Sequence, residues 1–521
     1  MLKILARLLP VGFIDWYEPW LLKKDERILD LIRNLDQNTI QTIVEKKLLR
    51  VLNQAAKYVP AYMDFVASNN VDVNKVNSLD TFNSLVPATT KNNYIDKYPL
   101  EERCINGKLP RYGNIDESAG STGVPTNWIR STKEEKIMHK LFRFEFDYDL
   151  QGNERNYVIL NTWSSGPWAT GVKFCEIMQD YALIKNIGSD INNTLRTLKL
   201  LGKKHNYIIA GYPPFIKRLV DKGQRQIKWE DYHIDIITGG EGFIPEWRDY
   251  ICKKLGVECK IFSAYGSSDV DIGIAFETPF TIFLISLIRR NIDLRKKLFG
   301  SKDKIPMVFQ YDPMQHYINN VMRTRKDGTK VSEFEITVLD KNIVSPKIKY
   351  NIYDEGGVFG FEEMMYTLSE YEKNFVGEYE KLEYSSKNIL RLPFLWINGR
   401  TDGTVSIDGA NVYPSQIEMC IHSDKELLEK THSFNISINK DKKGGFRFTV
   451  LIELKEKYKP NNKLQKKYHD VMLKNLQKLN DDYKESFTKN KIFADPKIIL
   501  YKFDTGPFKL ESEPIKYKYV I

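Results

Sequence analysis

The first part of the chain carries apolar residues at helical spacing. The segments DERILDLIRNL and TIVEKKLLRVLNQAAKYV, within residues 20–85, place Ile, Leu and Val three and four residues apart. Because about 3.6 residues make one helical turn, this spacing aligns the apolar side chains on one face. The pattern predicts a helical lead-in over residues 1–85.

Further along, apolar runs and helical segments alternate. The runs NYVILNTW, NYIIAG, DIITGG and CKIFSAYG are short and end at or beside Gly, Ser or Thr. Segments with helical spacing, such as TLRTLKLLG, PPFIKRLVDKG and EWRDYICKKLG, separate them. This order predicts an α/β fold with a mainly parallel sheet covered by helices, in which ligands lie at the carboxyl ends of the strands.

The pattern changes in the last part of the chain. Residues 305–400 are richer in strand-like runs (EFEITVLD, KIKYNIYD, FLWINGR). After them come a strand (FRFTVLIEL), a long lysine-rich helix and another strand (KIILYKF). We therefore predict a large N-terminal domain over residues 1–402 and a small, mobile α+β domain over residues 403–521.

Charge and cysteine content narrow the functional classes. The chain has 78 basic and 68 acidic residues and a net charge of +10, with lysines scattered throughout. This favours a solvated basic surface over a nucleic-acid-binding face, and it suits a polyanionic small ligand. The 5 cysteines form no CxxC pair, so we expect reduced thiols in a cytoplasmic protein and no metal-binding cluster.

The N-terminal segment MLKILARLLPVGFIDWYEPWLL is apolar but interrupted. Arg7, Pro10, Asp15 and Glu18 break the apolar stretch, which excludes a transmembrane helix and integral membrane association. No small-residue cleavage site follows, which argues against a signal peptide. We expect an amphipathic segment packed on the body of the protein, with peripheral membrane contact as the alternative.

One loop is rich in small and hydroxyl side chains. The sequence SAGSTGVPT, from Ser118 to Thr126, lets a phosphate approach the backbone closely and offers N–H and O–H donors. It lacks the GK[ST] ending of a Walker loop. By itself the loop is either an ordinary turn or a phosphate site.

Four further segments follow this loop in a fixed order. They are TGGEGF (from Thr238), SAYGSSD (from Ser263), YNIYDEGG (from Tyr350) and NGRTDGTVSIDGANVYPSQIE (from Asn398). The collinear series resembles the adenylate-forming superfamily, specifically its phenylacetate–CoA ligase-like and capsule-biosynthesis-type branch. The resemblance extends from about residue 45 to the end of the chain.

The resemblance implies acyl adenylation, in which a carboxylate joins the α-phosphate of ATP and pyrophosphate leaves. Such a reaction needs positioning and charge stabilisation rather than an enzyme nucleophile. The implied phosphate-binding residues are Ser118, Gly120, Ser121, Thr122 and Gly123. The implied residues around adenine are Gly239, Gly240, Glu241, Ala264, Tyr265, Gly266 and Ser267.

Three charged residues complete the implied nucleotide site. Asp354 would accept the ribose hydroxyls, and Arg400 would donate to ribose or phosphate oxygens. Asp269 stands where the family usually has Glu, and it would help to hold Mg²⁺.

The family's C-terminal catalytic lysine has no GK context in this chain. Counting from Thr505 selects Lys509, whereas aligning the last residues selects Lys516, which we favour slightly; Lys518 is a third choice. Asp402 falls where related enzymes hinge the small domain against the large one.

The acyl pocket and the acceptor stay open at this point. The loops 161–171 and 210–215 are aromatic and glycine-rich, so Trp163, Trp168 and Tyr212 belong either to an acid-binding pocket or to the core. The implied ligands are ATP, Mg²⁺, a small carboxylic acid, and coenzyme A or a carrier-protein arm as the thiol acceptor. The alternatives are an amine or hydroxyl acceptor in polysaccharide or secondary-metabolite tailoring, and a non-catalytic AMP-binding protein. A homodimer is compatible with all three.

Overall fold

The structure is a computed structural model. It describes residues 9–34, 36–118, 126–152, 154–165, 169–256, 259–300, 302, 305–324, 330–382, 389–400, 405–407, 410–440 and 446–509.

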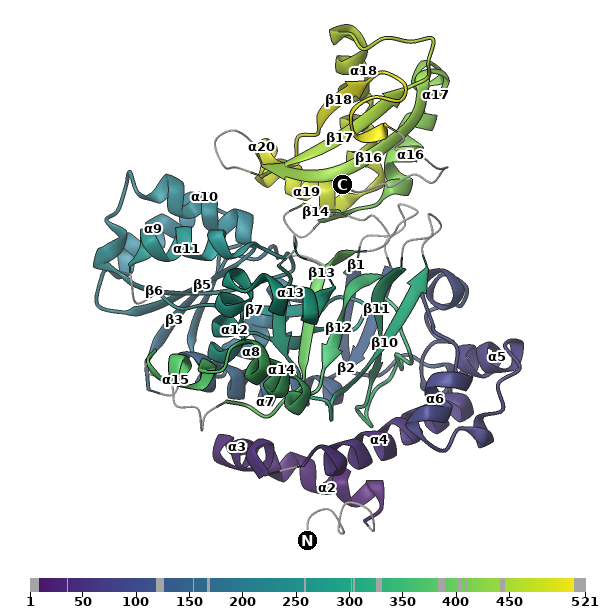
Figure 1. The fold of residues 1–521 in the computed structure, drawn as a ribbon, viewed down its shortest axis with the longest axis vertical. Coiled ribbons are helices and arrows are strands. Elements are labelled where there is room, and N and C mark those ends of the chain that lie inside the picture. The colour runs from purple at the N-terminus through teal and green to yellow at the C-terminus, as the bar shows by residue number, and fades with distance from the viewer. Residues whose placement is uncertain are drawn as a thin grey trace.

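A helical segment forms one end of the molecule. Its helices are α2 (Val11–Leu21), α3 (Asp25–Asn34), α4 (Gln37–Tyr58), α5 (Pro60–Ser68) and α6 (Leu79–Leu85). In Figure 1, α2, α3 and α4 lie along the lower edge, at the opposite end from the C-terminal part, and α5 and α6 lie at the right. The apolar residues of α4 at helical spacing, among them Val44, Leu48, Val51 and Ala55, are buried, so the predicted stripe is the face that packs on the body.

A sheet of 11 strands crosses the large part of the molecule. In spatial order the strands are β10 (His316–Thr324), β11 (Lys330–Val338), β12 (Asp354–Phe359), β13 (Phe394–Arg400), β9 (Met307–Gln310), β8 (Asp271–Phe276), β7 (Ile261–Ser267), β6 (His233–Gly239), β5 (Asn206–Gly211), β3 (Tyr157–Asn161) and β4 (Leu183–Asn186).

The predicted α/β fold class is confirmed, and the sheet is parallel in one half. Strands β4, β3, β5, β6 and β7 pair in parallel. The pairs from β7 to β10 are antiparallel. The parallel half contains the segments in which helices separate the apolar runs, because a parallel pair needs a crossover connection.

Helices cover the sheet on both sides. They are α7 (Thr132–Leu150), α8 (Ala169–Met178), α9 (Ile191–Leu201), α10 (Pro213–Gly223), α11 (Pro245–Leu255), α12 (Pro279–Arg290), α13 (Ile292–Phe299), α14 (Phe361–Tyr371) and α15 (Phe375–Glu380). Figure 1 shows α9, α10 and α11 together on one side of β3, β5 and β6. Separate from this sheet, β1 (Gly113–Ser118) and β2 (Thr126–Ser131) form an antiparallel hairpin that leads into α7.

The C-terminal part has a core of its own. Its strands are β14 (Val405–Ile407), β15 (Ala410–Val412), β16 (Thr431–Lys440), β17 (Phe446–Leu454) and β18 (Lys497–Tyr501). Its helices are α16 (Pro414–His422), α17 (Lys425–Lys430), α18 (Asn462–Leu479), α19 (Asp481–Lys489) and α20 (Lys491–Ala494). One buried apolar cluster joins them, with members from Val405 to Ile498. The predicted boundary at residue 402 lies outside the described residues.

Candidate nucleotide site

Two tyrosine–aspartate hydrogen bonds join two of the sequence segments, the one from Ser263 and the one from Tyr350. The Tyr265 hydroxyl, on β7, donates to Oδ2 of Asp354 at 2.5 Å. The Tyr350 hydroxyl donates to Oδ2 of Asp269 at 2.8 Å. Two segments that are far apart in the chain therefore meet at the end of β7.

The ring of Tyr265 is held by aromatic neighbours on the antiparallel half of the sheet. Its centroid lies 6.0 Å from the Phe309 ring and 6.2 Å from the Phe334 ring. The Tyr265 side chain is half-buried and Asp354 is buried. This geometry fixes both the position of the ring and the orientation of the carboxylate to which it donates.

The two strands on either side of the Ser/Gly/Thr loop contact the same group of residues. Nε1 of Trp128, on β2, donates to Oγ of Ser118 at 2.9 Å. The Trp128 ring lies edge-on to the Tyr350 ring, with 6.1 Å between centroids. Ser118 is buried at the end of β1, so Trp128 links the start of the loop to the tyrosine that holds Asp269. The predicted phosphate-binding residues Gly120, Ser121, Thr122 and Gly123 lie outside the described residues.

Two of the glycines predicted to lie around adenine occupy positions where a side chain would collide with neighbouring atoms. Gly240 has φ = +78°, and a Cβ there would lie 2.7 Å from Cε1 of Tyr212. A Cβ on Gly239 would lie 2.8 Å from the carbonyl oxygen of Ala264, the residue with which Gly239 pairs across β6 and β7. The backbones at these strand ends therefore approach each other more closely than a side chain permits.

The remaining residues of the β7 segment form its irregular end. A Cβ on Gly266 would lie 2.2 Å from the carbonyl oxygen of Ile272 on β8. The β7–β8 register shifts between Tyr265 and Ser267, which is the mark of a β-bulge. The regular β7–β8 pairing is therefore interrupted directly after Tyr265, in the segment that leads to Asp269.

Arg400 pairs with Asp354 in the register between β13 and β12. The Arg400 backbone therefore lies beside that of Asp354, the predicted ribose-binding residue. The structure does not describe the Arg400 side chain. Asp402, the predicted hinge, lies outside the described residues, as do Lys516 and Lys518. Lys509 is described and exposed.

Arg130 is a buried residue behind this site that the sequence did not reveal. Its Nη2 donates to the carbonyl oxygens of Ser268 at 2.7 Å and Val270 at 2.9 Å, the two neighbours of Asp269. Its Nη1 pairs with Asp116 on β1. The guanidinium thus ties the hairpin to both sides of Asp269. Burial alone lowers the pKa of Arg130, but Asp271 and Asp116 raise it above the ordinary value.

A second buried cation, Lys173, contacts the chain just after Asp269. Nζ of Lys173 lies 2.9 Å from Oδ1 of Asp271 and 2.9 Å from Oε1 of Glu135. Burial raises the pKa of Asp271, but the charges of Lys173 and Arg130 outweigh it and lower that pKa to about 2. Asp271 is therefore ionised at neutral pH, where it pairs with Lys173 and its charge stabilises the Arg130 guanidinium.

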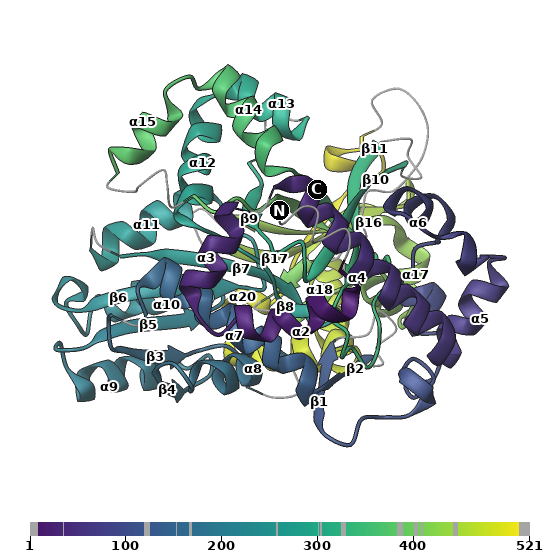
Figure 2. The same cartoon turned by 90° about the horizontal axis from the view of Figure 1, so that it is seen from below.

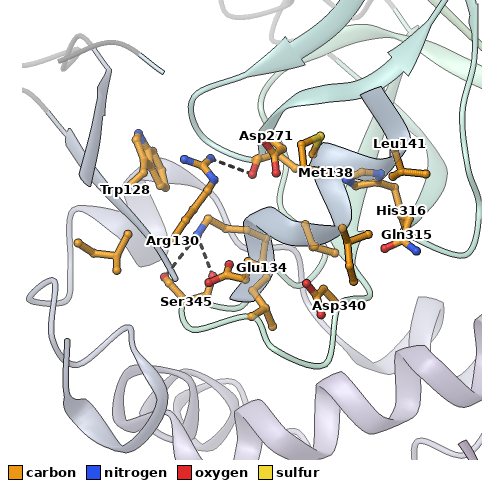
Figure 3. A pocket seen from close by; sticks show the side chains of 16 residues that line it. Trp128, Arg130, Glu134, Met138, Leu141, Asp271, Gln315, His316, Asp340 and Ser345 are labelled. Atoms are coloured by element: carbon orange, nitrogen blue, oxygen red, sulfur yellow. Dashed lines mark hydrogen bonds between the residues drawn. The ribbon is translucent and has the colours of Figure 1, made fainter. Parts of the chain in front are cut away.

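A small polar cavity lies behind Trp128 (Figure 3). Its volume of about 40 Å³ accommodates a few water molecules and is far below the roughly 300–1,000 Å³ of a ligand pocket. Lys347 lines it and donates to the carbonyl oxygen of Ser345 at 2.9 Å. Burial lowers the pKa of Lys347 to about 7. The cavity is part of the support of the site rather than a substrate pocket.

The acid-binding residues proposed from the two aromatic loops belong partly to the core. Trp163 and Tyr212 are both buried, with 6.5 Å between their ring centroids, and Trp163 lies edge-on to Phe174 at 4.8 Å. Trp168 lies outside the described residues. Ser164, in the first of these loops, contacts the C-terminal part. Nζ of Lys489, on α19, donates a hydrogen bond to Oγ of Ser164 at 3.3 Å.

Two further contacts connect the C-terminal part to the predicted site. Oγ of Ser406, on β14, donates to Oε1 of Glu241 at 3.3 Å. Nζ of Lys91 lies 5.8 Å from the centroid of the Tyr413 ring. Asp96, a few residues after Lys91, is close enough for Asp269 to raise its pKa, although burial is the larger cause. The C-terminal part therefore contacts the wall that contains Glu241.

Asp269 fits a magnesium ligand by its chemistry. Mg²⁺ is usually held by one or two carboxylates together with substrate phosphates, and a half-buried carboxylate fixed by Tyr350 can supply one oxygen. Within the described ranges, no group of three or more His, Cys, Asp and Glu residues is arranged to hold a metal ion by itself.

Comparisons with known proteins give a match in structure alone. No protein-family model matches the chain, and no curated protein matches it. It is similar to the crystal structure of 2-hydroxyisobutyryl-CoA ligase with 2-HIB-AMP and CoA in the thioesterification state. The TM-score is 0.62 at 13% identity, covering 94% of this chain and 91% of that chain.

The same ligase in the postadenylation state, with 2-HIB-AMP, gives a TM-score of 0.53 at 12% identity and the same coverage. An open conformation of that ligase gives 0.50 at 13% identity. Sequence identity at this level establishes the fold alone. The chain therefore has the fold of the adenylate-forming acyl-CoA ligases, with a large helix-covered sheet followed by a smaller C-terminal unit.

Proposed function

We propose that this protein activates a carboxylic acid with ATP and then transfers the acyl group to a thiol. The observation that carries the proposal is the meeting of Tyr265 with Asp354, and of Tyr350 with Asp269, at the end of β7. These residues come from separate segments of a series that resembles the adenylate-forming superfamily, and the chain has the fold of acyl-CoA ligases.

In the first half-reaction a carboxylate oxygen of the acid attacks the α-phosphorus of ATP. The bond to the bridging oxygen of pyrophosphate breaks, giving acyl-AMP. Tyr265 would lie against adenine, and Asp354 would accept hydrogen bonds from the ribose hydroxyls. Arg400, next to Asp354 in the β12–β13 register, would donate to ribose or phosphate. Bound Mg²⁺ would offset the negative charge of the phosphates, and Asp269 would hold it.

In the second half-reaction a thiolate attacks the acyl carbonyl carbon and AMP leaves with the electron pair of the acyl–oxygen bond. Support for a thiol acceptor comes from the arrangement of the two parts of the chain. The TM-score of the chain is 0.62 with the ligase in its thioesterification state. It is 0.53 with the same ligase in its postadenylation state, at equal coverage. Coenzyme A and a carrier-protein arm both present such a thiol.

A pyrophosphate-release assay over a panel of carboxylic acids tests the first half-reaction. The panel contains phenylacetate, for the branch suggested by the sequence, and 2-hydroxyisobutyrate, for the ligase of similar fold. We expect acid-dependent pyrophosphate release from at least one acid, and a hydroxamate when hydroxylamine traps the acyl-AMP. If AMP binds but no acid causes consumption of ATP, the protein is a non-catalytic AMP-binding protein and the proposal fails.

The acceptor is tested with the acid that supports adenylation. Adding coenzyme A, or a phosphopantetheinylated carrier protein, should yield a thioester that is cleaved by neutral hydroxylamine. Formation of an amide or an oxygen ester from an added amine or sugar, with no thioester from either thiol, would instead support the amine or hydroxyl acceptor. The 5 unpaired cysteines support a reducing, cytoplasmic location, which we propose with this function.

A further inference from the structure

Helix α2 exposes aromatic side chains along one face. The exposed fractions are 42% for Phe13, 71% for Trp16, 40% for Tyr17 and 44% for Trp20. Their spacing of three and four residues places them in one stripe. Their rings contact one another, with centroids 5.5 Å apart for Phe13 and Trp16 and 4.9 Å apart for Tyr17 and Trp20. These four residues form what we call the α2 aromatic face.

The acidic residues of α2 face the body of the protein. Asp15 is buried and pairs with Arg50 of α4. Oε1 of Glu18 accepts from Nζ of Lys47 at 2.8 Å and from Nε2 of Gln315 at 2.6 Å. The helix therefore has the reverse of the usual polarity, with charges inside and aromatic rings outside.

These ion pairs prevent the helix from turning its rings inward. The side chain of Lys47 is 1% exposed, so rotation of α2 about its axis would leave a buried ammonium without its carboxylate. An unpaired buried charge is strongly unfavourable. The outward direction of the rings is consequently fixed by α4 and by the segment that carries Gln315.

Basic groups border one end of the α2 aromatic face. Lys23 is exposed, and Nζ of Lys140, on α7, lies 3.5 Å from the carbonyl oxygen of Pro19. The guanidinium carbon of Arg27 lies 3.7 Å from the centre of the Trp20 ring. Burial lowers the pKa of Lys140, and the nearby cations Lys23, Arg143 and Lys136 lower it further. Two exposed acids, Glu26 and Asp30, lie further along on α3.

The chain before this helix has the same character. Residues 1–8 read MLKILARL, with two basic residues, no acidic residue and otherwise apolar ones. The described chain begins directly after them, at residue 9. In sequence, this apolar and basic stretch therefore comes shortly before the helix that carries the α2 aromatic face.

The position of α2 leaves the candidate nucleotide site accessible. Figure 2, seen from below, shows α2, α3 and α4 in front of the sheets, and Figure 1 shows the C-terminal part at the opposite end. A large partner on the lower face would not cover the contacts between Glu241 and Ser406. Among the described residues, no helix is long and apolar enough to cross a membrane, so a lipid partner would be bound at its surface.

We propose that the α2 aromatic face binds the surface of a lipid bilayer that contains anionic headgroups. Trp and Tyr prefer the boundary between headgroups and acyl chains, where the ring is apolar and its N–H or O–H stays hydrated. The bordering lysines and arginines attract anionic lipid. A helix with aromatic residues on one side lies in the plane of the interface in this way.

Sedimentation with lipid vesicles tests the proposal on the full chain. We expect binding to vesicles of equal parts phosphatidylcholine and phosphatidylglycerol, weaker binding to phosphatidylcholine alone, and loss of the difference at high salt. The double variant Trp16→Ser/Tyr17→Ser should bind the anionic vesicles at least about tenfold more weakly, because two rings no longer enter the interface.

A matched variant removes two exposed, largely apolar side chains from other faces of the protein. Leu200 on α9 is 79% exposed and Tyr366 on α14 is 65% exposed, so Leu200→Ser/Tyr366→Ser should bind vesicles as the wild type does. Circular dichroism and the thermal midpoint establish that both variants are folded. The charge variant Lys23→Glu/Lys136→Glu should weaken binding to anionic vesicles only.

Three results would overturn the proposal. The first is a wild-type chain that does not sediment with anionic vesicles. The second is an equal loss of binding in the α2 and matched variants. The third is a wild-type dimer that Trp16→Ser/Tyr17→Ser converts to a monomer, because the α2 aromatic face would then contact a second copy of the chain.

Discussion

The hydroxyl of Tyr265 donates to Oδ2 of Asp354 at 2.5 Å, although three strands separate β7 from β12 in the sheet. The tyrosine ring lies beside Phe309 of β9, with 6.0 Å between the ring centroids. One bond therefore joins the predicted adenine-binding ring to the predicted ribose-binding carboxylate. It makes the position of each depend on the other.

Substitution of Asp354 should weaken ATP binding more than acid binding. Asp354→Asn removes the charge that would accept the ribose hydroxyls, and hydrogen bonds to a charged group contribute about 1.5–3 kcal/mol. We expect the KM for ATP to rise roughly 10- to 100-fold with little change in the KM for the acid.

Tyr265→Phe serves as the matched variant because it keeps the ring and removes only the hydroxyl. Its effect should be smaller, about tenfold or less in the KM for ATP. If Asp354→Asn raised the KM of the acid and left that of ATP unchanged, the ribose role of Asp354 would be wrong.

Arg130 should act as a positioning residue for Asp269. Arg130→Lys keeps one positive charge beside Asp116, but an ammonium cannot reproduce the planar fork that reaches both Ser268 and Val270. We expect a fall of roughly tenfold in kcat. The Mg²⁺ concentration at half-maximal rate should also rise, since the backbone on both sides of Asp269 is less restrained.

Arg248→Lys provides the comparison. Arg248 is bonded to both oxygens of the buried Glu277, at 2.7 Å each, so this variant weakens a buried ion pair away from Asp269. Both variants should lower the thermal midpoint. An equal shift of the Mg²⁺ requirement in the two would show that Arg130 contributes to stability alone.

Lys347 should make the free energy of unfolding depend on pH in the neutral to alkaline range. Burial lowers its pKa from 10.5 to about 7, so between these values the unfolded chain binds a proton that the folded chain does not. The free energy of unfolding therefore rises with pH across this window. The destabilisation of the folded state by burial of the Lys347 ammonium is fully present below about pH 7. It is absent above pH 10.5.

Lys347→Met should reduce this rise, as measured by urea unfolding at several pH values between 7 and 10.5. Lys466→Met, at an exposed position on α18, should leave the pH dependence of the wild type unchanged. Identical profiles for wild type and Lys347→Met would contradict the lowered pKa.

One of two C-terminal lysines should be catalytic. Alanine at Lys516 or at Lys509 should lower adenylation roughly 10²- to 10³-fold, the range for loss of one group that stabilises transition-state charge, whereas the other substitution should have little effect. Pyrophosphate release by each variant measures this. Lys502→Ala, at an exposed lysine nearby, is the control, and near-wild-type rates in both alanine variants would exclude both lysines.

Much of the fold, and the grouping of residues in the candidate nucleotide site, could be predicted from sequence because the signals are local. The spacing of Val44, Leu48 and Val51 predicts the buried face of α4, and the alternation of apolar runs with helical segments predicts the α/β class. The order of the segments that contain Tyr265, Asp269 and Asp354 indicated a common site, and the structure brings those three residues together.

The tertiary structure decided which charges are buried and which rings are exposed. Arg130 lies 138 residues before Ser268 and 140 before Val270, and no local pattern relates them. On α2, Asp15 and Glu18 appeared in the sequence as interruptions of an apolar stretch, but they are the residues that pack on the body. The physical reason is that buried carboxylates need cations, and Arg50 and Lys47 of α4 supply them only once the chain has folded.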